Sequence, residues 1–105
     1  MDRFHAYSDV STDTPSKYIS QLCKHFAHKL TVSHDDSKGR IEFPIGLCLL
    51  ESRPDVLHME VEAASEEDLT RLQEVVASHL ERFAWRSPPQ IHWQRSTDKD
   101  AGQGA

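Results

Sequence analysis

Residues 56–63 read VLHMEVEA, and their side chains alternate between apolar and polar types along the whole stretch. Such alternation indicates an antiparallel strand that packs one face on a core and leaves the other face in water. The core side is predicted to contain Leu57, Met59, Val61 and Ala63, and the wet side His58, Glu60 and Glu62. The stretch therefore predicts a sheet that is covered on one face only.

The residues before this strand predict three more strands joined by short turns. The strands are expected at residues 31–34, 40–43 and 47–53, and the turns at residues 35–39, 44–46 and 54–55. The turns are rich in Asp, Ser, Gly and Pro, which are the usual turn-forming residues. The segment LCLLESR is the most continuously apolar of the strands, so we expect it near the middle of the sheet. Strands in succession with tight turns are typical of a meander.

A strand and a helix are predicted ahead of the meander. Residues 4–10, FHAYSDV, alternate like a strand, and residues 15–29 follow the three-four spacing of an amphipathic helix. Thr14 suits the N-cap and Pro15 the first helical position, because proline disfavours helical geometry in the residue before it. Thr12 is an alternative cap. The apolar stripe of this helix comprises Tyr18, Ile19, Leu22, Cys23, Phe26 and Leu30.

A second helix is predicted after residue 65. Ser65 suits the N-cap, and Asp68 follows three positions later, close to a capping box. Pro88 and Pro89 stop the helix, residues 90–95 form a candidate terminal strand, and residues 96–105 are expected to be a disordered tail because they lack large apolar side chains. The core stripe of this helix comprises Leu69, Leu72, Val76, Leu80 and Phe83.

The predicted order is strand, helix, four strands, helix and strand. Both helices can bury their apolar stripes if they lie on the same face of the sheet. We therefore predict an α+β two-layer fold over residues 1–95, one domain with a four- to six-stranded antiparallel sheet and two helices on one face. The open face is expected to include His5, Tyr7, His58, Glu60 and Glu62.

Composition limits the classes of function. The chain has 105 residues, 28% of them charged, and a formal net charge of −5. Nucleic-acid binding favours an excess of Lys and Arg, so this charge argues against it. No apolar run is long enough to cross a membrane, and the N-terminal residues do not resemble a signal peptide. Two cysteines in such a chain are expected to be reduced thiols, so we expect a cytoplasmic protein.

Several runs together resemble a known family. They are YISQLCKHFAHK at 18–29, GRIEF at 39–43, GLCLLES at 46–52, HLERFAWR at 79–86 and IHW at 91–93. This set resembles a bacterial family known as domain of unknown function 2218, whose activity is not established. Members are sometimes encoded near siderophore-interacting proteins, which implies a role around iron uptake. The order of elements is also similar to the TATA-binding-protein-like fold, a likeness that implies topology and no function.

Basic side chains gather at the ends of the two predicted helices. They are His25, His28, His79, Arg82 and Arg86. If the two helix ends meet, these residues form a positive patch that can bind a small anionic ligand, because arginine grips carboxylates and phosphates with two hydrogen bonds. The alternative is that these cations only complete the negative ends of the helix dipoles.

Metal binding and thiol catalysis are not expected. His25 and His28 are three residues apart on a helix, but structural zinc normally has four ligands, and the chain has no paired Cys or His loops. Cys23 lies late in its helix on the apolar stripe and Cys48 in an apolar strand, where burial raises the pKa of a thiol. No metal and no cofactor are predicted.

The leading hypothesis is a non-enzymatic binding or accessory domain linked by family resemblance to iron–siderophore metabolism. Its partner is expected to be a small anionic ligand or a ferric-siderophore-related protein, bound at the helix-end patch or on the open sheet face. Two alternatives stay open. One is a small enzyme that uses His79 with Arg82 or His25 on an anionic metabolite, and the other is a scaffold homodimer that buries the open sheet face.

Overall fold

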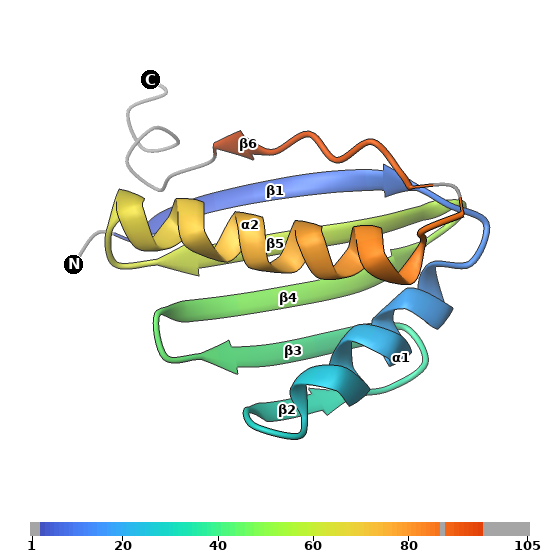
Figure 1. Cartoon of the computed structure of the whole chain (residues 1–105), viewed down its shortest axis with the longest axis horizontal. Helices are drawn as coiled ribbons and strands as arrows, with labels where there is room; N and C mark the ends of the chain where they lie inside the picture. Colours follow the sequence, from blue (N-terminus) through green and yellow to red (C-terminus); the bar gives the residue numbers. More distant parts are fainter. Residues whose placement is uncertain (1–2, 87, 96–105) are drawn as a thin grey trace.

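The predicted sheet is present, and both helices lie on one of its faces (Figure 1). The computed structural model describes residues 3–86 and 88–95, and this part of the chain contains six strands and two helices. In order they are β1 (Phe4–Ser11), α1 (Pro15–Phe26), β2 (Thr31–His34), β3 (Lys38–Phe43), β4 (Gly46–Arg53), β5 (Val56–Ala63), α2 (Glu66–Phe83) and β6 (Gln94–Arg95). The α+β two-layer prediction is confirmed.

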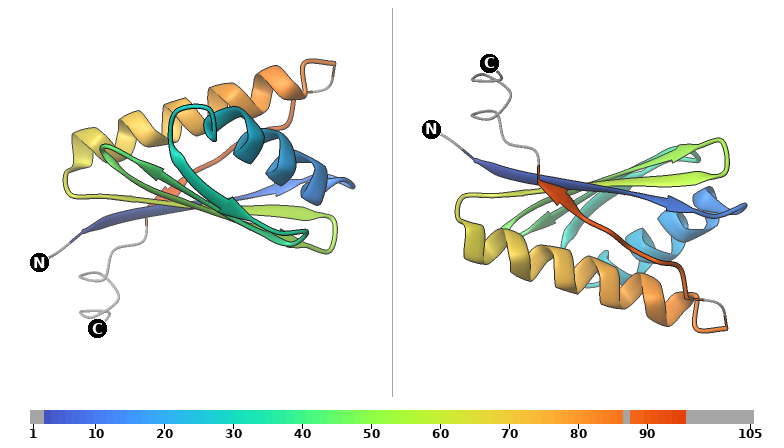
Figure 2. Two further views of the ribbon diagram at one scale, coloured as in Figure 1. Left: turned by 90° about the horizontal axis from the view of Figure 1, so that it is seen from below. Right: turned by 90° about the horizontal axis from the view of Figure 1, so that it is seen from above.

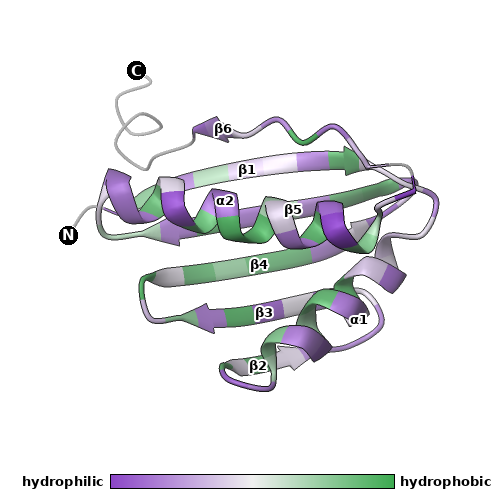
Figure 3. Cartoon of the chain, viewed as in Figure 1, coloured by the Kyte–Doolittle hydropathy of each residue, from purple (hydrophilic) through white to green (hydrophobic). Residues whose placement is uncertain are grey.

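The strand order across the sheet is β2-β3-β4-β5-β1-β6, and every neighbouring pair is antiparallel. The meander from β2 to β5 is therefore confirmed, and β1 adds to its far side. The stretch 56–63 is β5, where Met59 lies between Leu50 of β4 and Ser8 of β1. All four residues predicted for its core side are at most 1% exposed. β4 is green over most of its length in Figure 3 and lies inside the sheet, as its apolar sequence predicted.

The two helices divide the covered face between them. α1 packs mainly on β2, β3 and β4, while α2 packs on β5, β1 and β4. Figure 2 shows both helices on the same side of the twisted sheet, so the other face is left open. Ile19 and Leu22 of α1 and Leu69, Leu72 and Leu80 of α2 are completely buried. The apolar stripes read from the sequence are thus the surfaces that join the two layers.

The helix ends agree with the predictions except at one place. Ser65 caps α2, and its Oγ accepts a hydrogen bond from the backbone N–H of Asp68 at 3.1 Å. Thr14 is the N-cap residue of α1 and Pro15 its first residue, as predicted, although the Thr14 side chain makes no capping hydrogen bond and its N–H donates to Oγ1 of Thr12. The prediction that this helix reaches residue 29 is wrong. It ends at Phe26, whose carbonyl accepts the N–H groups of residues 29 and 30 as the chain turns into β2.

Two glycines assigned to turns lie inside strands. Gly39 belongs to β3 and Gly46 to β4, and no glycine in the described residues has a positive φ. These positions therefore need the absence of a side chain, not a special backbone conformation. The candidate strand at 90–95 is limited to Gln94 and Arg95, although Ile91 and Trp93 pack against the core. The predicted tail at 96–105 lies outside the described residues.

Neither described helix is both long and apolar enough to span a lipid bilayer.

Candidate binding site

The second half of α1 meets the second half of α2 through aromatic rings. The ring centroids of His25 and His79 are 4.8 Å apart, and His79 lies equally close to Phe26. The ring of Phe83 is 6.0 Å from His25. His79 is fixed by its own helix, because its Nδ1–H donates to the carbonyl of Val75 at 2.7 Å. The structure thus brings together two of the five predicted site residues in a packed helix junction.

The charges around this junction are mostly positive. His25 is exposed, but desolvation by the groups around it lowers its pKa, and the nearby His79, His28 and Arg82 lower it further. A neutral His25 ring is therefore favoured at pH 7. Neutral rings suit packing against Phe26 and Phe83 more than they suit holding an anion.

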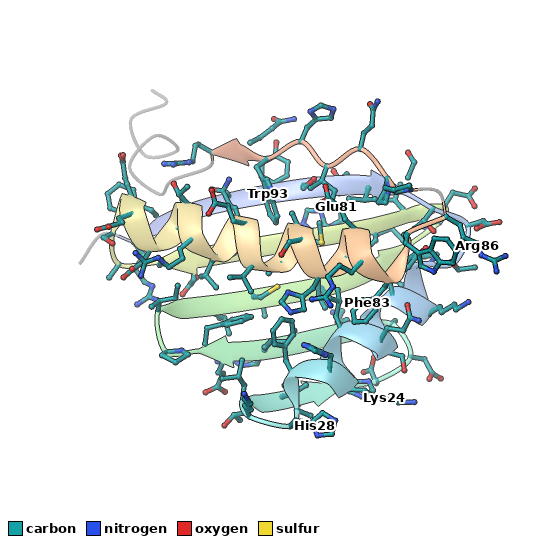
Figure 4. The ribbon with its side chains drawn as sticks, in the orientation of Figure 1. Lys24, His28, Glu81, Phe83, Arg86 and Trp93 are labelled. Atoms are coloured by element: carbon teal, nitrogen blue, oxygen red, sulfur yellow. The ribbon has the colours of Figure 1, made fainter. Side chains whose placement is uncertain are left out.

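Of the other predicted residues, His28 and Arg82 lie near enough to His25 to lower its pKa, but the five do not converge on one point. Figure 4 shows His28 at the outer end of α1 and Arg86 beyond the end of α2, on different sides of the helix pair. The guanidinium carbon of Arg86 lies 5.1 Å from the ring centroid of Trp85, as in a cation–π contact. The five residues therefore do not form one patch. In residues 3–86 and 88–95, no group of three or more His, Cys, Asp or Glu side chains is arranged to hold a metal ion.

Both cysteines are free and completely buried. Burial raises the pKa of the Cys23 thiol to about 11. Burial also raises the pKa of Cys48, and Cys23 raises it further. These thiols have the environment of packing residues, and neither has the cationic, accessible setting that activates a nucleophile.

We predict that the native protein resists thiol labelling. At pH 8, a disulfide-exchange reagent is expected to modify Cys23 and Cys48 at least tenfold more slowly than it modifies the chain unfolded in urea, because the thiolate is disfavoured and inaccessible. Absorbance of the released thiol measures the rate. Equal rates in the folded and unfolded chain would contradict the buried positions.

A hollow of about 450 Å³ lies on the opposite, open face of the sheet. This volume falls in the range of small-molecule sites. Its lining crosses β3, β4 and β5, with residues 33–35 beside it, and includes Lys38, Arg40, Leu49, Glu51, His58 and Glu60. These residues lie in two rows of cross-strand neighbours that run across β3, β4 and β5. Lys38 pairs with Glu51 and Glu51 with His58, while Arg40 pairs with Leu49 and Leu49 with Glu60.

The acids of the hollow already have partners. Asp35 accepts hydrogen bonds from Ser37 and from the backbone N–H of Lys38. Glu51 and Glu60 are paired with cations. Glu51 accepts two hydrogen bonds from Arg53, at 3.0 and 2.8 Å, and this contact lowers the pKa of Glu51. Lys38 appears in none of the ion pairs among the described residues, and Arg40 makes one exposed contact of 3.5 Å with Glu42. The cations of β3 are consequently the charges with the fewest partners at this place.

His58 is held between two carboxylates. Its Nδ1 lies 2.5 Å from Oδ1 of Asp9, and its Nε2 lies 2.8 Å from Oε2 of Glu60. Carboxylate oxygens only accept hydrogen bonds, so both ring nitrogens must donate and the ring is an imidazolium. Burial opposes this charge, but the hydrogen bonds to Asp9 and Glu60 outweigh burial and raise the pKa of His58.

A second hollow of about 430 Å³ lies at the end of the sheet, around the turn between β3 and β4, and reaches Asp68 at the start of α2. Arg40 lines both hollows, and Leu47 of β4 lines the second as Leu49 lines the first. Arg3 donates to Glu62 at 3.0 Å in this second hollow. The two hollows therefore meet at Arg40.

The sequence indicated this face but missed its cations. His58 and Glu60 were predicted on the wet side of the sheet, whereas Lys38 was assigned to a turn and Arg40 was not singled out. The available signal was the alternation of KGRIEF at 38–43, which places Lys38, Arg40 and Glu42 on one face. Lys38 could not be placed beside Glu51 without the register between β3 and β4.

Comparisons with known proteins cover both the helix junction and the open face. No curated protein matches the sequence. The NMR structure of PA4090 from Pseudomonas aeruginosa is similar over 87% of this chain and 95% of that chain, with 36% sequence identity and a TM-score of 0.75. Residues 7–94 match the family model described as "Uncharacterized protein conserved in bacteria (DUF2218)". The chain therefore belongs to the DUF2218 family, as its sequence motifs predicted.

Proposed function

We propose that this protein is a non-enzymatic binding domain that takes a small anionic ligand in the 450 Å³ hollow of the open sheet face. The observation that supports this most directly is the position of Lys38 and Arg40 at the hollow. They are two residues apart on one strand and their side chains share a face; Lys38 is in none of the ion pairs among the described residues, and Arg40 has one exposed contact of 3.5 Å with Glu42. Two such cations can bind one carboxylate or phosphate together.

The state of His58 favours binding over acid–base catalysis. A general base needs a ring nitrogen with an available lone pair. Both ring nitrogens of His58 are hydrogen-bonded to carboxylates, so the protonated ring contributes a positive charge to the lining of the hollow. That charge also offsets the charge of Glu60, which would otherwise repel an anion.

The helix junction supports an anion less well. Arg86 and His28 point away from it, and the pKa of His25 is lowered. The family resemblance adds a link with iron–siderophore metabolism to this proposal, and it selects iron-free and ferric siderophores as anions to test beside simple ones.

Replacing both Lys38 and Arg40 with alanine is expected to weaken anion binding about tenfold or more, since each lost charge-assisted hydrogen bond contributes roughly 1–2 kcal/mol at an exposed site. Backbone amide NMR shifts during titration with butyrate, citrate, inorganic phosphate and siderophores measure the affinity. Wild-type shifts are expected to cluster on β3, β4 and β5.

The control is Lys24→Ala, which removes one cation from the exposed side of α1, across the sheet from the hollow. This variant is expected to bind as the wild type does. Shifts that cluster around His25 and His79, or equal loss in the control and the double variant, would overturn the proposal.

A further inference from the structure

The open face has an apolar stripe at its centre. Leu47 and Leu49 are successive outward-facing residues of β4, and Leu49 is 37% exposed, which is high for a leucine in the middle of a sheet. Leu49 lies in the first hollow and Leu47 in the second. The two positions are about 7 Å apart along the strand. The stripe therefore leads out of the proposed anion site into the neighbouring hollow.

Charges on either side of the stripe change along its length. Arg40 and Glu60 flank Leu49, whereas Glu42 and Glu62 flank Leu47. Lys38 lies one step further from Leu47, in the row beyond Arg40. An anionic group is attracted most strongly near Lys38, which is in none of the ion pairs among the described residues, because Arg3 and His5 near Leu47 are already paired with Glu62. Any anion that extends along β4 is thus oriented with its charged end at Lys38.

We propose that the ligand class is an amphipathic monoanion with a linear apolar chain. Its carboxylate-like head binds Lys38 and Arg40, and its chain lies on Leu49 and then on Leu47. This inference rests on the proposed function, because it takes the same cations as the anchor. It adds that the ligand has an alkyl chain, that this chain runs from Lys38 toward Leu47, and that it enters the second hollow.

An extended peptide fits these hollows less well. β3, β4 and β5 each have a hydrogen-bonded neighbour on both sides, so their backbone groups are already paired. A peptide on this face could not add to the sheet as a further strand, which is how extended peptides usually gain affinity. An alkyl chain needs no such backbone partners.

The test is to titrate the full protein chain with butyrate, hexanoate and octanoate, which differ only in the length of the alkyl chain. Backbone amide NMR shifts measure the binding. Each added CH₂ that is partly buried is expected to tighten binding about two- to fourfold, so octanoate should bind at least tenfold more tightly than butyrate. The shifts are expected to extend from Lys38 toward Leu47 as the chain grows.

A matched pair of variants separates the head from the chain. Leu47→Asn is expected to reduce octanoate affinity about fivefold or more and to leave butyrate affinity unchanged. Leu47→Ala, which introduces no polar group, should give the same pattern with a smaller reduction. Lys38→Ala is expected to weaken all three ligands by the same factor.

The possible outcomes distinguish failure of this inference from failure of the proposed anion-binding function. If butyrate binds through Lys38 and octanoate binds no more tightly, the proposed alkyl-chain contact is wrong, but the anion site is not. A gain that survives Leu47→Asn would also overturn the proposed alkyl-chain contact, because the chain would then lie elsewhere. If no carboxylate binds through Lys38 and Arg40, the proposed function fails and the inference fails with it. Self-association through this face, seen by sedimentation and abolished by Leu49→Lys, would likewise overturn it.

Discussion

Gly46→Ala is expected to lower the free energy of unfolding by about 3 kcal/mol or more, an effect at the upper end of overpacking substitutions. A Cβ at this position would lie 2.1 Å from the carbonyl oxygen of Glu62 and 2.6 Å from Cδ1 of Leu72. The carbonyl belongs to the backbone of β5, next to Ala63, the partner of Gly46 in the sheet. It cannot move away without disturbing the pairing of β4 with β5, so relief of the clash requires rearrangement of the sheet.

Gly39→Ala provides the comparison. A Cβ there would meet Sγ of Cys23 at 2.8 Å and Cγ2 of Ile19 at 3.1 Å, which are side-chain atoms of α1. A small shift of α1 can relieve these contacts, so we expect a loss of about 1–2 kcal/mol. Urea unfolding followed by circular dichroism measures both variants. A Gly46→Ala variant as stable as the wild type, or less affected than Gly39→Ala, would contradict this explanation.

The fold could be predicted because its main signals are local. The alternation of VLHMEVEA determines which side of β5 is buried, and Ser65 followed by Asp68 determines where α2 begins. Neither signal depends on residues far along the chain. The end of α1 could not be placed in the same way, because the helical spacing continues to Leu30 although the last helical residue is Phe26. The carbonyl of Phe26 accepts the N–H groups of residues 29 and 30 in a turn that leads into β2, and the sequence carried no signal for this turn.

The candidate site depended on information that the sequence does not contain locally. The hollow exists because Lys38 lies beside Glu51 and Glu51 beside His58, and one change of register would separate them. The role of Gly46 likewise depends on how closely β5 and Leu72 approach β4. The approach of His25 to His79 was also left open by the sequence, because two helices on one face of a sheet need not meet at their ends.

His58→Ala is expected to destabilise the protein by about 2 kcal/mol at pH 6. The substitution removes two charge-assisted hydrogen bonds and leaves the carboxylates of Asp9 and Glu60 facing each other across a gap. The side chains of Asp9 and Glu60 are about half exposed, so water compensates part of the loss. His58→Gln, which keeps a polar side chain without the charge, should recover some of the stability.

The pH dependence separates this charge effect from simple loss of packing. Because the folded protein raises the pKa of His58, the protonated ring stabilises the fold fully below its unfolded pKa of about 6.5. This stabilisation is lost as the pH rises through the folded pKa. The difference in unfolding free energy between wild type and His58→Gln is therefore expected to be largest near pH 6 and to shrink toward pH 9. A packing effect would be equal at both pH values, and NMR titration of the ring would then give a pKa at or below 6.5.

Since the same charge offsets Glu60 in the hollow, anion affinity should weaken over the interval in which this stability is lost, and the two titrations should share one midpoint.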